Sequence, residues 1–314
     1  MVDSIGEPIC VAQCPWLPGE LSVADRIVDC LTSAIGQSLM PLEAHGIPTE
    51  RVPVTLLVNL PPERPGLPES LVDAIRQAII RVFRNTFSRI GIARCGHAGG
   101  VLALQSAITA LARHPVSACV IAAADSYMEP DTLEWLEETG QLHGAGEANN
   151  AWGFVPGEGG GAALLTLPPV AEQMALAPLG HVVGVGSGRE AQLIRTGSVC
   201  LGEGLTAAMR DALGSLPNER TISDVYCDMN GDPYRADEFA FAVTRTRERF
   251  ISASDFVAPA DCWGDVGSAS APLLTALACI AGAKGYSKGP DALIWASSDT
   301  GERGAAVVGV AGST

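Results

Sequence analysis

The feature that most constrains the fold is an alternation of short apolar segments with helical segments, which occurs twice along the chain. Buried strands are predicted from their apolar runs at 52–62, 88–94 and 117–125 in the first half, where a glycine-rich turn also leads into a strand within 152–167. In the second half they are predicted at 181–188, 222–231, 291–298 and 305–312. Helices are predicted from their spacing of apolar residues at 68–83, 99–114, 202–216 and 270–283. This alternation is typical of α/β proteins, in which helices cover mainly parallel sheets. We therefore expect two similar halves, 1–168 and 169–314, that meet near Pro168 and Pro169.

Composition and charge narrow the possible partners. The chain has 314 residues, of which 47% are hydrophobic, so it can bury a sizeable core. We predict no membrane span, because no apolar run is long enough. A net charge of −15 argues against binding to nucleic acid or to an anionic membrane. Between Ala74 and Ala124, however, there are several arginines and no acidic residue. These arginines either pair with acids elsewhere in the fold or form a local basic face for an acidic partner.

The nine cysteines are distributed without metal-finger or C-x-x-C spacing. Most of them lie in apolar segments, which indicates free thiols in a reducing compartment and favours a cytoplasmic protein. The glycine-rich segment at 184–188 lacks the spacing of a dinucleotide-binding fingerprint. We therefore predict no cofactor and no dedicated metal site from sequence motifs.

Three stretches resemble the β-ketoacyl synthase (condensing enzyme) branch of the thiolase superfamily. The stretch 153–165, GFVPGEGGGAALL, looks like the Gly-Phe-x-x-Gly-Glu-Gly-x-Gly turn of those synthases. The stretch 204–242 is similar to their helix, strand and His-Gly-Thr-Gly-Thr-Pro segment, and 264–280 is similar to their Gly-His-x-x-Gly-Ala-Ala-Gly helix start. The resemblance implies a thiolase-like, five-layer αβαβα fold with two similar halves. It also implies an acyl carrier protein, or another protein, as a partner.

The same resemblance implies a site built from a cysteine at the start of a buried helix and from two histidines. In such enzymes the helix end favours the thiolate and backbone amides hold the oxyanion. Alignment of the helix after Val101 puts His97 at the position of the nucleophile, with Cys95 two residues earlier. Pro233 and Gly264 as anchors put Asp228 and Asp265 at the two histidine positions. The family's lysine falls at Ala260, and the phenylalanine of its C-terminal loop is missing from SSDTGERGA.

These replacements predict a degenerate member of the family. A carboxylate at Asp228 or Asp265 would repel the malonyl carboxylate and the enolate that the histidines would stabilise. We expect His97, Asp228 and Asp265 to converge, with the ring of His97 at the first helical turn and about 4–8 Å from both carboxylates. Such a set can act as a base with an orienting acid, bind a divalent metal, or form an inert polar cluster. We also expect Glu302 and Arg303 nearby, in a pocket that is wet and charged.

Two classes of function remain open. In the first, the chain is a non-condensing pseudoenzyme, a binding or adaptor protein with a protein partner, and Cys95 is a structural thiol that points away from the pocket. In the second, it is a divergent acyltransferase or thioester hydrolase that uses Cys95 or His97. Reaction with acyl thioesters would separate the two.

Two expectations concern the edges of the first sheet. Synthases have a core strand before the region that matches 2–8, so we expect this first strand, and the family's cap insertions, to be missing. In the family, the strand before the nucleophile pairs with its twin across a two-fold axis. Here that strand is 88–94, and we predict a homodimer through it.

Overall fold

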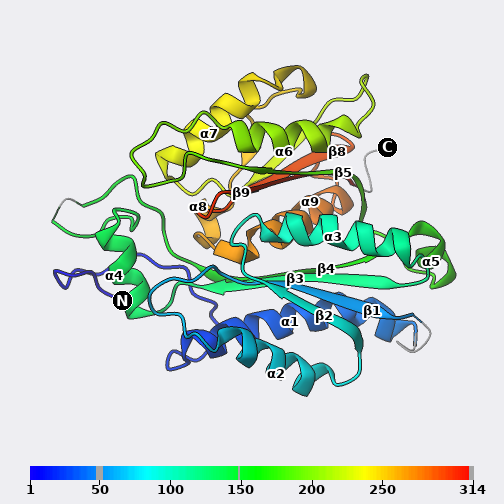
Figure 1. The fold of residues 1–314 in the computed structure, drawn as a ribbon, viewed down its shortest axis with the longest axis horizontal. Coiled ribbons are helices and arrows are strands. Elements are labelled where there is room, and N and C mark those ends of the chain that lie inside the picture. Colours follow the sequence, from blue (N-terminus) through cyan, green and yellow to red (C-terminus); the bar gives the residue numbers. More distant parts are fainter. Residues whose placement is uncertain (47–51, 148, 311–314) are drawn as a thin grey trace.

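The computed structural model describes residues 1–46, 52–147 and 149–310, which form two β-sheets and the helices that cover them (Figure 1). The first half contains helices α1 (Val23–Ala44), α2 (Leu71–Phe83), α3 (Gly99–Arg113) and α4 (Pro130–Glu138), and strands β1 (Val54–Asn59), β2 (Phe87–Ala93), β3 (Ala118–Ser126) and β4 (Glu158–Thr166). The short helix α5 (Pro168–Gln173) begins at the predicted boundary and connects β4 to the second half.

The second half repeats the alternation. Its strands are β5 (Gly180–Arg189), β6 (Asp224–Cys227), β7 (Phe256–Val257), β8 (Asp291–Ser297) and β9 (Glu302–Val310). Its helices are α6 (Glu203–Gly214), α7 (Pro233–Thr244), α8 (Ala260–Trp263) and α9 (Ser270–Ala283), with two 3-10 turns, η1 (Arg247–Arg249) and η2 (Gly267–Ala269). Within the described ranges no helix combines the length and the apolar character that crossing a bilayer would require.

The two sheets share one strand order. The first sheet has the order β2-β1-β3-β4, and the second has the order β7-β6-β8-β9-β5. In each sheet the first three strands are parallel and the fourth is antiparallel to the third. In the second sheet β5 then pairs antiparallel with β9. Among the described residues the first sheet has no counterpart of β5, which agrees with the expected absence of one strand.

The elements stack in five layers, as predicted. Helix α1 packs on one face of the first sheet, and α2 packs beside it. Helices α3 and α9 lie between the two sheets, and α6 and α7 cover the outer face of the second sheet (Figure 1). Because α3 contacts both sheets and its first residues, Gly99, Gly100 and Val101, are buried, the loop at its N-terminus lies deep in the molecule. The candidate site residues gather there.

Candidate functional site

His97 lies in the tight turn between β2 and α3. Gly96 has a φ of 63°, a left-handed conformation that glycine adopts without strain, and it reverses the chain just before His97. Asn59, at the end of β1, holds this turn: its amide donates to Gly96 O at 2.7 Å, and its oxygen accepts from Cys95 N at 3.1 Å. We expected His97 in the first helical turn. It lies two residues before Gly99, where α3 begins, because Ala98 is the N-cap.

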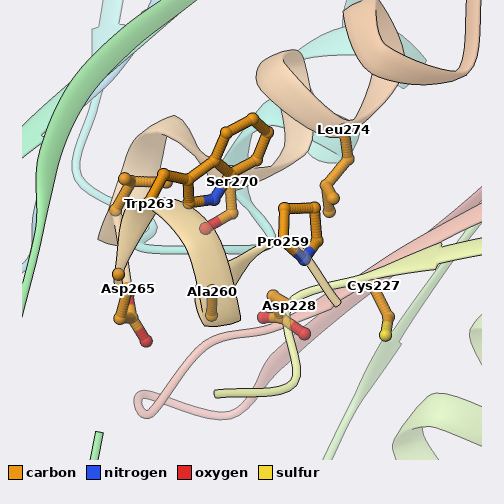
Figure 2. A pocket seen from close by; sticks show the side chains of 10 residues that line it. Cys227, Asp228, Pro259, Ala260, Trp263, Asp265, Ser270 and Leu274 are labelled. Atoms are coloured by element: carbon orange, nitrogen blue, oxygen red, sulfur yellow. The ribbon is translucent and has the colours of Figure 1, made fainter. Parts of the chain in front are cut away.

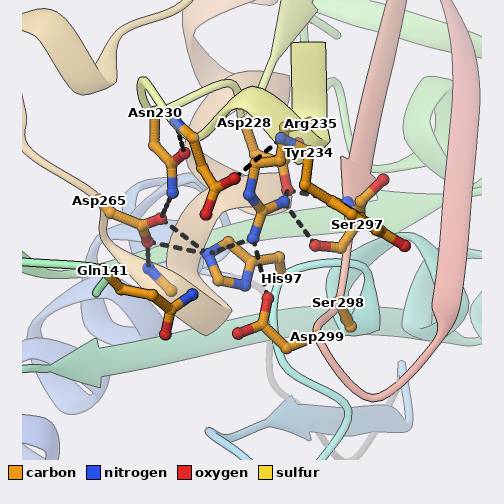
Figure 3. A network of polar contacts seen from close by, with 12 residues as sticks. His97, Gln141, Asp228, Asn230, Tyr234, Arg235, Asp265, Ser297, Ser298 and Asp299 are labelled. Atoms are coloured by element: carbon orange, nitrogen blue, oxygen red, sulfur yellow. Dashed lines mark hydrogen bonds and ion pairs between the residues drawn. The ribbon is translucent and has the colours of Figure 1, made fainter. Parts of the chain in front are cut away.

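Asp265 is the direct partner of His97. The ring Nε2 lies 2.8 Å from one carboxylate oxygen and 3.1 Å from the other, which is closer than the predicted range (Figure 3). Asp265 also accepts hydrogen bonds from Asn230 Nδ2 at 2.6 Å and from Gly267 N at 2.7 Å. The exposed fractions of His97 and Asp265 are 7% and 4%, so the pair is buried.

Arg235 joins the second predicted carboxylate to this pair. Its Nη1 donates to Asp228 Oδ2 at 2.7 Å and to Ser297 O at 2.6 Å, and its Nη2 lies 3.4 Å from His97 Nε2 (Figure 3). The same Nη2 contacts Asp299 Oδ1 at 3.3 Å. Asp228, which directly follows β6, also accepts from Ser297 N at 2.8 Å. His97, Asp228 and Asp265 therefore belong to one network, with a guanidinium between the two acids.

The charges in the network set one another's protonation. Burial lowers the pKa of His97, but the charge of Asp265 beside it more than offsets this, so the pKa of His97 is raised. Burial would raise the pKa of Asp265, but His97 and Arg235 hold it well below its usual value. For Asp228 burial prevails over Arg235 and His97, and its pKa is raised. His97 and Asp265 therefore form an ion pair over a wider pH range than an isolated histidine would allow.

The cavity next to these acids is very small. It measures about 10 Å³ and is lined by both carboxylates together with apolar side chains, among them Trp263, Pro259 and Leu274 (Figure 2). A volume of this size holds about one water molecule. Asp228 Oδ1 is buried without a hydrogen-bond partner among the described residues. The predicted wet, charged pocket is wrong: the charges are present, but side chains fill the space around them.

Cys95 does not line this cavity. Its backbone is fixed by Asn59 and by Ser298, whose hydroxyl donates to Cys95 O at 2.5 Å and accepts from Ala98 N at 2.9 Å. The side chain is half-buried. Burial, and to a lesser extent the charge of Glu302, raise the pKa of the Cys95 thiol. A raised pKa reduces the thiolate fraction at neutral pH and thereby its reactivity.

Arg303 and Glu302 take separate roles. Arg303 is buried and its Nε donates to Glu238 at 2.5 Å, while its Nη2 donates to the hydroxyl of Tyr234 at 2.8 Å. Glu302 binds Arg189 at 2.7 Å on the surface. Neither residue contacts His97, so the expectation that both would belong to the His97 pocket is not supported by their contacts.

The sequence analysis missed Arg235. This residue lies inside the stretch 204–242 that carries the resemblance, two residues after the anchor Pro233. Asp232, whose side chain accepts from Tyr234 N, caps α7, and Pro233 follows it. A positive charge in the first turn of a helix is unfavourable beside the helix dipole. An arginine at that place is therefore a sequence signal for buried acidic partners.

Comparisons with known proteins bear on the fold. The sequence matches no protein-family model and no curated protein. A ketosynthase from module 6 of the bacillaene synthase of Bacillus subtilis 168 is similar in structure, with a TM-score of 0.66 and 16% identity over 83% of this chain. The chain has the ketosynthase fold. It spans about half the length of that ketosynthase, 55% of which is covered.

Two further ketosynthases are similar over almost all of this chain. The ishigamide ketosynthase/chain length factor gives a TM-score of 0.63 at 19% identity, and covers 96% of this chain and 87% of its own. The other is a ketosynthase of a type II polyketide synthase, solved in complex with its acyl-carrier protein and bound to the hexaketide. Its TM-score is 0.70 at 13% identity, with the same coverage of both chains. The predicted resemblance to ketosynthases is thus confirmed for the fold.

Proposed function

We propose that this chain is a binding protein built on a ketosynthase fold, and that it does not carry out decarboxylative condensation. The observation that carries the proposal is the closed ion network of His97, Asp265, Arg235 and Asp228. Its charged groups already pair with one another, and the cavity beside them holds about one water molecule. An acyl or malonyl group has no room there.

Electrostatics support the same conclusion. Condensation develops negative charge on an enolate oxygen, which needs hydrogen-bond donors or positive charge nearby. The pKa of Asp265 is held low, so this carboxylate stays ionised beside His97. Arg235 is the permanently charged positive group of the network, and its donors are engaged by Asp228, Asp299 and Ser297 O. A metal ion at this place would compete with that guanidinium for the same acids.

The proposal predicts that the protein takes up no acyl group. The purified chain would be incubated with acetyl- and malonyl-coenzyme A and with an acyl-loaded carrier protein, and its intact mass followed. We expect an unchanged mass and no decarboxylation of the malonyl thioester, while a condensing ketosynthase run in parallel is acylated.

Acylation would support the alternative, a divergent acyltransferase or thioester hydrolase. A covalent adduct that maps to Cys95 and is lost in Cys95→Ala would overturn the proposal. Thioester hydrolysis that is lost in His97→Gln but kept in Cys95→Ala would overturn it as well, and would assign the reaction to His97.

Two kinds of partner fit the surface next to β2. This strand is the outer strand of the first sheet, and the proposed homodimer pairs it with its twin.

The basic residues Arg81, Arg84 and Arg89 are exposed around the end of α2 and the start of β2, and among the described residues none of the three makes an ion pair. They offer a docking surface for an acidic protein, such as an acyl carrier protein. Charge reversal in Arg81→Glu/Arg84→Glu should abolish a salt-sensitive association with such a carrier, measured by titration calorimetry.

A further inference from the structure

We propose that the open edge of β4 is the acceptor site for a single extended strand of another polypeptide. A groove of about 820 Å³ runs along this edge. Strand β4 forms its floor from Glu158 to Thr166, α1 forms one wall and α9 forms the other. The groove is a separate space from the small cavity at Asp228 and Asp265, and Trp263 and Val266 line both.

The internal repeat of the chain indicates what the groove fits. The two sheets have the same strand order, and β4 corresponds to β9. In the second sheet the far edge of β9 is occupied by β5, which runs antiparallel to it and is covered by α6 and α3. The groove lies at the corresponding edge of β4, between α1 and α9. By this correspondence the occupant is a strand that runs antiparallel to β4.

Helix α9 supports the same inference. Its sequence, SAPLLTALACIAGA, contains no charged residue, and a helix that is apolar on all sides is normally buried on all sides. Yet Leu273, Ala276 and Cys279 are only partly buried, and these three residues line the groove. Ile280 is 43% exposed. An apolar strand in the groove would cover this side of α9.

The edge of β4 also lacks the features that protect an edge strand. Natural edges carry charges, prolines or bulges that prevent pairing with another chain. From Gly159 to Thr166, β4 has none of these, and its nine residues pair with β3 without a register shift. Since β4 is the last strand of the sheet that the described residues form, its outer backbone groups are a template for addition of a strand, a recurring mode of peptide recognition.

The lining of the groove defines the occupant more closely. Among the described residues that line it, Glu158 is the one acidic side chain; it lies at one end and is already paired with Arg26 at 2.9 Å. Alternate side chains of an added strand would face Leu273 and Ala276 on α9, or Ser33 and Gln37 on α1. The occupant is thus an uncharged segment with apolar residues at every second position. Since the floor lies between two helices, the groove accepts a lone strand and not the helix-covered edge of a second copy.

The test is a selection of displayed random decapeptides on the full chain, with removal of those that also bind Ala276→Trp. The tryptophan fills the groove from α9, and Ile108→Trp, on the exposed side of α3, is the matched control. We expect peptides that alternate apolar and small uncharged residues. They should bind wild type and Ile108→Trp equally, bind Ala276→Trp at least tenfold more weakly, and slow hydrogen exchange of the amides at 159–166.

Three results would overturn the proposal. One is that no selected peptide distinguishes Ala276→Trp from wild type. Another is that bound peptides leave the exchange of β4 amides unchanged. The third is saturable binding of a long-chain fatty acid that excludes the peptides without protecting β4, which would make the groove a lipid site. The proposal rests on the proposed binding function, but acyl-transfer assays test that function and amide exchange tests the groove, so either can fail alone.

Discussion

At the scale of single residues, the chain places a full network of charges where the resemblance implies a catalytic site. The register of the helix after Val101, compared with the family, predicted His97, and the family anchors Pro233 and Gly264 predicted Asp228 and Asp265. Arg235 could not be placed in the same way, since its role depends on how α7 lies against β8. The arginine contacts Ser297 O, a group from a strand about sixty residues away in sequence.

Removal of Arg235 should destabilise the protein strongly. In Arg235→Met, Asp228 stays buried and loses its charged partner, and such changes cost about 3–5 kcal/mol. Urea denaturation, followed by circular dichroism, would measure the loss in free energy of unfolding.

The matched control is the double variant Asp228→Asn/Arg235→Met. With both charges removed, it should be more stable than Arg235→Met alone, because no unpaired carboxylate remains buried. If the double variant is as unstable as the single one, the ion pair is not the source of the loss.

The His97–Asp265 pair should also make stability depend on pH. The pKa of His97 is raised in the folded chain above its ordinary value of about 6.5. The stabilisation by the His97–Asp265 ion pair is therefore complete below about pH 6.5, and it is lost as the pH rises through the pKa of His97 in the folded chain. We expect the unfolding free energy of wild type to fall more steeply than that of His97→Gln between about pH 6.5 and pH 8.

A scan of urea midpoints for both proteins measures this difference. The range ends near pH 8 because buried thiols such as Cys119, with a pKa raised to about 12, add their own loss of stability once unfolded thiols ionise. Parallel curves for the two proteins over this range would show that His97 is not part of a charged pair.

At the scale of elements, the strands were easier to predict than the open edges of the sheets. The apolar runs at 52–62 and 291–298 contain β1 and β8, because fully buried strands carry a strong local signal. Helix α1 was not predicted, although Val23, Ile27, Leu31 and Ile35 show helical spacing, because Gly36 and Pro41 interrupt the pattern. Which edge of a sheet stays open depends on the order of its strands, and this order could not be read from the sequence pattern. The prediction that the first strand is missing was the one indication that an edge of the first sheet, here β4, would be free.

The other free edge, at β2, should mediate dimer formation. Ile90 and Ile92 are half-buried there, and the backbone on the outer side of β2 has no partner strand among the described residues. We expect sedimentation at micromolar concentration to give about 65 kDa, twice the 32.5 kDa of one chain. The carbonyl of Ala93 accepts from Leu60 N on the β1 side, so the amide of its neighbour Ile92 faces the open edge. Ile92→Pro should therefore shift the population toward monomer, and a wild-type monomer at this concentration would contradict the prediction.

At the scale of the whole molecule, the two halves divide in sequence but share one interior. The division at 168 and 169 stays a prediction, and it coincides with the start of α5. One apolar cluster joins the halves: it contains Leu104 and Leu111 from α3, Ile121 from β3, and Ala296 and Ala306 from the second sheet. Since α3 is packed against both sheets, neither half can bury its own face of the middle layer alone.

The molecule should therefore unfold as one cooperative unit. A substitution that destabilises one half should lower the urea midpoint of the other half as well. Leu111, at the C-terminal end of α3, is 3% exposed and belongs to the shared cluster, whereas Trp295 is fully buried in the second half and stacks on Phe239 at 5.0 Å. Leu111→Ala should cost about 2–5 kcal/mol. In a background in which Trp16, Trp135, Trp152 and Trp263 are replaced by phenylalanine, so that the fluorescence reports on Trp295, it should lower the urea midpoint seen by fluorescence as much as that seen by circular dichroism. Ile108→Ala, on the exposed side of the same helix, should change both midpoints little. Separate transitions for the two probes in Leu111→Ala would show that the halves are independent folding units, with α3 held by only one of them.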